Sequence, residues 1–60
     1  MLVKDLVKTF SADTKYHIVY ADNPHYIYWW GQGNKTNTTC DDKEIKVVRC
    51  DRNKGIVIYI

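Results

Sequence analysis

The chain has 60 residues, a formal net charge of +2, and 45% hydrophobic and 27% charged residues. This length predicts one domain, residues 1–60, which buries roughly 60% of its unfolded surface and has little room for an enclosed catalytic pocket. The composition excludes a disordered chain, and the weak charge does not by itself indicate nucleic acid. No apolar run approaches the ~18 residues of a membrane span, and no signal peptide is apparent, so we expect a cytoplasmic protein without membrane contact.

Residues 3–10 show helical periodicity. Their apolar side chains recur at i, i+3, i+4 and i+7, which places them on one face of a helix. The polar residues 11–14 end this segment. The apolar residues are Val3, Leu6, Val7 and Phe10.

Residues 15–21 alternate as a strand does, and Asp22, Asn23 and Pro24 then signal a turn. An aromatic strand is expected at 25–30. Regular alternation places Tyr26, Tyr28 and Trp30 on one of its faces. Ile27 and Trp29 then lie on the other face, and the sequence leaves open which of Trp29 and Trp30 faces the helix.

The second half of the chain predicts a long polar loop at 31–42 and strands at 43–50 and 56–60, joined by a turn that ends in Gly55. The last strand is apolar on both sides, which indicates an interior position in the sheet. We therefore expect an α+β domain in which a short N-terminal helix packs on a four-stranded, mostly antiparallel sheet made of two β-hairpins.

A helix of about eight residues is roughly 12 Å long and covers one face of such a sheet only in part. If the isoleucines of the first and last strands lie under the helix with Tyr28, several apolar side chains fall on the other face. These are Val19, Ile27, Trp29, Val48, Val57 and Tyr59. The long loop, a second copy of the chain or another partner could cover them, and a homodimer is the favoured interpretation.

The favoured function is a non-enzymatic interaction protein that binds and occludes a partner, because Trp, Tyr and Arg dominate interface energies. The candidate partner-binding residues are Tyr28, Trp29, Trp30, Arg49 and Arg52. The alternative is a small nucleic-acid or nucleotide-binding protein, in which sheet aromatics stack on bases. Its candidate residues are Tyr26, Tyr28, Trp30, Arg49, Arg52 and Lys54.

No catalytic constellation, cofactor or metal site is predicted. His17, His25, Cys40 and Cys50 lack the paired spacing of zinc ligands. The sequence leaves open whether the two cysteines form a disulfide, and it predicts that Cys40 lies in a polar loop and that Cys50 behaves as a small hydrophobic residue.

The opening residues 1–7, with the sequence MLVKDLV, resemble the short N-terminal helix of small phage-encoded accessory proteins. Residues 15–21 with the following turn, and residues 56–60, match the β-meander that follows in such proteins, whereas the loop at 31–42 and the Trp29–Trp30 pair depart from that pattern. Some small phage proteins inhibit host defence, including anti-CRISPR proteins. The resemblance implies a host protein or defence complex as the target and the host cytoplasm as the location, and it assigns no functional residue.

Overall fold

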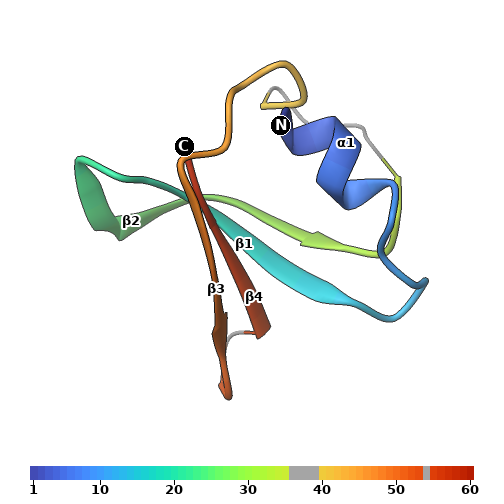
Figure 1. Ribbon diagram of the computed structural model, residues 1–60. Helices are drawn as coiled ribbons and strands as arrows, with labels where there is room; N and C mark the ends of the chain where they lie inside the picture. The colour runs from blue at the N-terminus through green and yellow to red at the C-terminus, as the bar shows by residue number, and fades with distance from the viewer. Residues whose placement is uncertain (36–39, 54) are drawn as a thin grey trace.

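The computed structural model describes residues 1–35, 40–53 and 55–60 (Figure 1). Its elements, in chain order, are α1 (Val3–Val7), β1 (Lys15–Tyr20), β2 (Asn23–Gln32), β3 (Val47–Asp51) and β4 (Gly55–Tyr59). The strands form one sheet in the order β2-β1-β4-β3, in which β1 and β4 are parallel and the outer pairs are antiparallel. The structure thus confirms one short helix with a four-stranded sheet and the interior position of the last strand, and it shows that the sheet is mixed. No helix in the described part of the chain is long and apolar enough to cross a bilayer.

Helix α1 is shorter than the periodicity of residues 3–10 predicts. The Leu2 N–H donates to the Asp5 carboxylate at the helix start. After Val7 the chain tightens, because Thr9 N–H bonds Leu6 O and Phe10 N–H bonds Val7 O, each over three residues. The predicted apolar face is nevertheless retained, since Val3, Val7 and Phe10 are buried and Leu6 packs against them.

The core lies between α1 and the face of the sheet that carries the isoleucines. Its buried members are Val3, Val7, Phe10, Tyr16, Ile18, Cys40, Ile58 and Ile60. Cys40 lies in a turn, within the segment predicted as a loop, but its side chain is fully buried. Cys50 is exposed instead, and no disulfide joins the two residues.

Residues 40–45 are fastened to the start of the helix. The Val3 N–H donates to Lys43 O (3.0 Å) and the Lys4 N–H to Asp41 O (3.1 Å). These carbonyls satisfy N–H groups that lack partners within a helix. An exposed ion pair between Lys4 and Asp42 raises the pKa of Lys4. The end of the predicted long loop thus closes the core beside the helix.

A bulge in β2 reverses part of the predicted alternation. Ile18 lies opposite Trp29 and Val19 lies opposite Ile27, so Tyr28 is an extra residue between them. Trp29 therefore shares the helix-side face with Ile18, which answers the question that the sequence left open. Trp30 lies opposite His17 on the face away from the helix.

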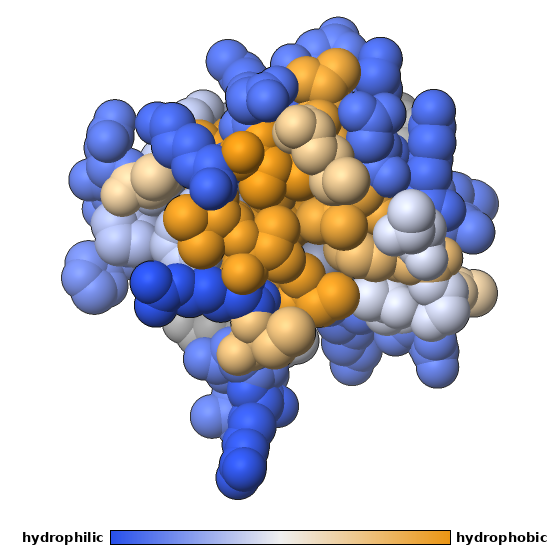
Figure 2. Space-filling model, viewed as in Figure 1, coloured by the Kyte–Doolittle hydropathy of each residue, from blue (hydrophilic) through white to orange (hydrophobic). Residues whose placement is uncertain are grey.

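The register of β3 corrects a second placement. Val48 lies opposite Ile58, so it belongs to the helix side of the sheet, whereas Val47 shares the far face with Tyr59. Because α1 does not reach this end of the sheet, Val48 remains 43% exposed, and Val47 on the far face is 44% exposed. Figure 2 shows hydrophobic side chains gathered near the centre of this view, bordered by hydrophilic ones.

The far face of the sheet is closed at its centre. Val19 and Val57 are only 3% and 8% exposed although no helix covers them. The register jumps from Val19–Ile27 to Tyr20–Asn23, so residues 24–26 have no partner in β1. Pro24 and His25 line a small cavity of about 150 Å³ with both valines, which shows that this part of β2 helps to cover the face.

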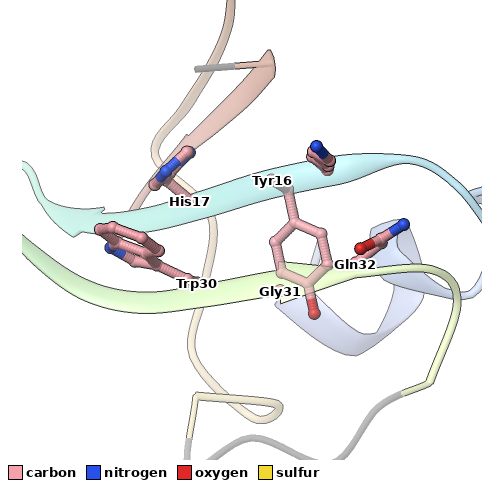
Figure 3. Close-up of a pocket in the computed structure, with 6 residues that line it drawn as sticks. Tyr16, His17, Trp30, Gly31 and Gln32 are labelled. Atoms are coloured by element: carbon pink, nitrogen blue, oxygen red, sulfur yellow. The ribbon is translucent and has the colours of Figure 1, made fainter.

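Tyr16 and Gly31 form a close cross-strand contact. They are paired in the register, and the Tyr16 ring lies across Gly31 in β2 (Figure 3). A Cβ atom added to Gly31 would overlap the ring. Gly31 is therefore required by the space that its neighbour occupies.

We expect Gly31→Ala to destabilise the fold by about 1–3 kcal/mol, because the Tyr16 ring must move out of a packed core. Urea denaturation followed by circular dichroism measures the change. Gln32→Ala, at the next, exposed position, should alter the free energy of unfolding by no more than about 0.5 kcal/mol. Equal stability of Gly31→Ala and the unchanged chain would contradict the contact.

Alkaline pH should weaken the fold through Tyr16. Burial raises the pKa of its phenol above the ordinary value of 10.0, against a smaller opposite effect of the Trp29 indole. The folded chain holds this proton more tightly than the unfolded chain, so the stabilisation is complete below pH 10.0 and declines above it. The free energy of unfolding should fall as the pH rises above about 10, and it should fall less in Tyr16→Phe. Tyr26→Phe, which changes an exposed phenol, is the control and should retain the full decline.

Candidate interaction groove

A groove of about 430 Å³ lies at the β1–β2 side of the sheet (Figure 3). Its lining consists of Lys15, Tyr16, His17, Trp30, Gly31 and Gln32. Two cross-strand pairs build it, Lys15 with Gln32 and His17 with Trp30. Because these four residues alternate with the buried Tyr16 and the close-packed Gly31, their side chains share the face away from α1.

Trp30 is the most exposed large apolar side chain of the described residues, at 70%. The His17 ring meets it edge-on, with ring centroids 5.3 Å apart. Figure 3 shows the two rings side by side above the strands. This contact holds one side of the indole in place, while much of its surface remains available to a partner.

His17 connects the groove to the small cavity under Pro24 and His25, because it lines both. Its Nδ1 atom is buried and makes no hydrogen bond to any described residue. Burial of such an atom without a partner costs about 1–3 kcal/mol. An unsatisfied group of this kind calls for an explanation, and functional sites are one place where the cost is tolerated.

The groove contains one of the nearby cationic side chains, and Arg49 lies away from it. Lys15 is its one charged lining residue among those described, and it lies at the same end as the Gln32 amide. Arg49 shares the far face but lies on β3, three interstrand spacings or roughly 14 Å from Trp30. Its guanidinium lies over the Tyr59 ring, 5.8 Å from the centroid. The groove therefore offers an indole, an imidazole, an amide and one cation.

The five candidate partner-binding residues do not form one cluster. Trp30 lies in the groove, while Trp29 and Tyr28 lie toward the helix side, where Tyr28 packs against the core. Arg49 and Arg52 lie at the opposite edge of the sheet, on β3 and just after it.

The alternative set for nucleic acid is also divided. Tyr26 is 58% exposed and lies in the unpaired part of β2, outside the groove. Tyr28 meets Tyr20 edge-on at 5.1 Å. Lys54 lies outside the described residues. Trp30 is thus the one aromatic member of this set that lines the groove.

Of the six residues that line the groove, sequence reasoning singled out Trp30 alone. Residues 15–21 were expected to form a strand, in which Lys15 and His17 fall on the same face. Their contact with Trp30 could not be predicted, because the bulge at Tyr28 determines the register of β2 and the alternation of the sequence does not reveal it.

Within the described ranges, no three His, Cys, Asp or Glu residues come close enough together to hold a metal ion. His17 and His25 share the small cavity with Asp51, whereas Cys40 is in the core and Cys50 on β3. No protein-family model, curated protein or solved structure matches this chain.

The two tryptophans should differ in their access to a quencher. A variant that keeps only Trp30 (Trp29→Phe) should show a Stern–Volmer constant for acrylamide roughly twice that of the variant that keeps only Trp29 (Trp30→Phe). The reason is that Trp30 is 70% exposed and Trp29 37% exposed. Steady-state fluorescence measures both, and free N-acetyltryptophanamide gives the fully exposed limit. Stronger quenching of Trp29 would contradict the bulged register.

Proposed function

We propose that this chain is a small non-enzymatic binding protein that occludes a partner protein, and that the groove around Trp30 is its contact surface. The observation that carries the proposal is the position of Trp30, 70% exposed and held by His17 at the side of an open groove. Exposed tryptophan in a pre-formed hollow is typical of the residues that dominate binding energy.

The small size of the domain strengthens this argument. A 60-residue chain has few large apolar side chains to spend on its core, and yet its bulkiest residue lies outside the core cluster. Removal of apolar surface from water contributes about 25 cal/mol per Å². A partner that covers the indole would remove this apolar surface from water, and the complex would gain the corresponding free energy.

The lining of the groove also suggests the chemistry of the partner. An apolar or aromatic side chain would stack on the indole, and a neighbouring carboxylate would pair with Lys15. The buried His17 Nδ1 lies beside this contact. We therefore propose an exposed acidic and apolar segment of a folded protein as the element that is bound.

The identity of the target rests on the resemblance of residues 1–7 and the following strands to small phage accessory proteins. On that basis we propose a host protein or defence complex, bound in the host cytoplasm and blocked by occlusion. No chemical step is required of the chain in this role.

We expect Trp30→Ala to weaken partner binding by about 30-fold, which corresponds to a hot spot of about 2 kcal/mol. The tagged chain captures its partner from a host extract, and the purified partner is then titrated by calorimetry. Because Trp30 lies outside the core, the melting temperature of the variant should stay close to that of the unchanged chain.

Tyr26→Ala is the matched control, since this exposed aromatic residue lies outside the groove and should bind normally. Equal affinity of Trp30→Ala and the unchanged chain would refute the groove as the contact surface. Titration with single-stranded oligothymidylate tests the second candidate. An affinity that falls steeply as salt is added, together with quenching of the Trp30 fluorescence by the oligonucleotide, would favour nucleic acid.

A further inference from the structure

Strand β3 presents hydrogen-bonding groups at an open edge of the sheet. Ile60 donates its N–H to Val19 O and accepts from the Ala21 N–H, each at 2.9 Å, so its backbone groups point away from β3. Backbone direction alternates along a strand, so Val57 and Tyr59 bond toward β3. Their partners there are Arg49 and Val47.

The residues between these pairs therefore point outward. Val48 and Cys50 direct their N–H and C=O groups to the outer edge of β3, where no described strand lies. Every residue of β3 is exposed. An uncovered edge of this kind is a template for pairing with another strand.

The apolar surface of the molecule continues to this edge. Val47 and Val48 are exposed on opposite faces of β3, and Ile45 and Ile56 beside them are only partly buried. A second strand paired with β3 would cover part of this surface.

Charge selects among the antiparallel registers that two β3 strands can adopt. Outward groups must meet outward groups, so the two-fold axis passes through Val48, Arg49 or Cys50. An axis at Arg49 puts two guanidiniums directly opposite each other, which is unfavourable. An axis at Val48 leaves Lys46 against Cys50 and forms no ion pair within the strand. An axis at Cys50 places Arg49 of each copy opposite Asp51 of the other.

We propose that a second copy of this chain pairs antiparallel with β3 about an axis at Cys50, which joins two four-stranded sheets into one of eight strands. Two symmetric Arg49–Asp51 pairs set the register, and the outward groups of Cys50 bond across the axis. The Arg49 guanidinium lies over the Tyr59 ring on the inner neighbour β4 in the single chain, so it turns toward the outer edge to meet Asp51 of the second copy. This dimer uses the edge opposite the Trp30 groove, so it does not depend on the proposed partner surface.

Cys50 is a built-in probe of this register, since the two thiols face each other only with the axis at this residue. Diamide takes up the two protons and two electrons released when a disulfide forms. We expect rapid formation of a covalent dimer from the unchanged chain and none from Cys50→Ser, because Cys40 is fully buried. Val48→Cys in the Cys50→Ser background reports the axis at Val48, and Ser11→Cys in that background gives the rate of random collision at an exposed site.

Charge exchange tests the same register without cysteine chemistry. Arg49→Asp and Asp51→Arg should each raise the dimer dissociation constant about tenfold or more, measured by sedimentation equilibrium, because each places like charges opposite one another. The double variant should restore dimerisation. Asp51 also accepts the Asn53 N–H at 2.7 Å, so circular dichroism accompanies each measurement.

The outcomes separate this proposal from the partner surface. A chain that stays monomeric at millimolar concentration would overturn the dimer, and faster cross-linking of Val48→Cys than of Cys50 would overturn the register. Cross-linking of Cys50 no faster than that of Ser11→Cys would also overturn it. Trp30→Ala should dimerise normally whether or not it has lost its partner.

Discussion

The parallel pairing of β1 with β4 is the constraint on which the rest of the structure depends. Parallel neighbours cannot be joined by a tight turn, so the chain must leave the sheet centre and return to it over a long connection. That connection supplies both outer strands, β2 and β3, and the segment at 40–45 that closes the core. The two most available surfaces, the Trp30 groove and the β3 edge, are thus consequences of one pairing.

The five-residue helix explains why the helix-side face of the sheet remains open near β3. It provides Val3 and Val7 to the core, and its short length leaves the β3 side of the sheet uncovered. Cys40 and Phe10 complete the core from outside the helix. On the far face, the unpaired residues 24–26 of β2 close the centre and leave the groove beside it. Packing in so small a domain protects one core and cannot also cover both ends of the sheet.

Sequence periodicity predicted the features that depend on the local pattern of apolar residues. The spacing of Val3, Leu6, Val7 and Phe10 identified the buried face of the helical segment, and the apolar residues 56–60 indicated an interior strand. Periodicity did not predict the features that depend on contacts between distant parts of the chain. Nothing local distinguishes buried Cys40 from exposed Cys50, because the first depends on contacts with the helix far away in sequence. The faces of Trp29 and Trp30 depended on a bulge, and alternation holds only while pairing is regular.

The bulge at Tyr28 has a consequence for how such a domain can change over time. Loss of the extra residue would leave regular pairing, in which Ile27 still lies opposite Val19 and Trp29 still lies opposite Ile18, with β1, β4 and the core in place. A deletion, which is usually disruptive inside a strand, would here remove one aromatic side chain without changing which face its neighbours occupy. The length of this strand can therefore vary at a position where the fold already accommodates one additional residue.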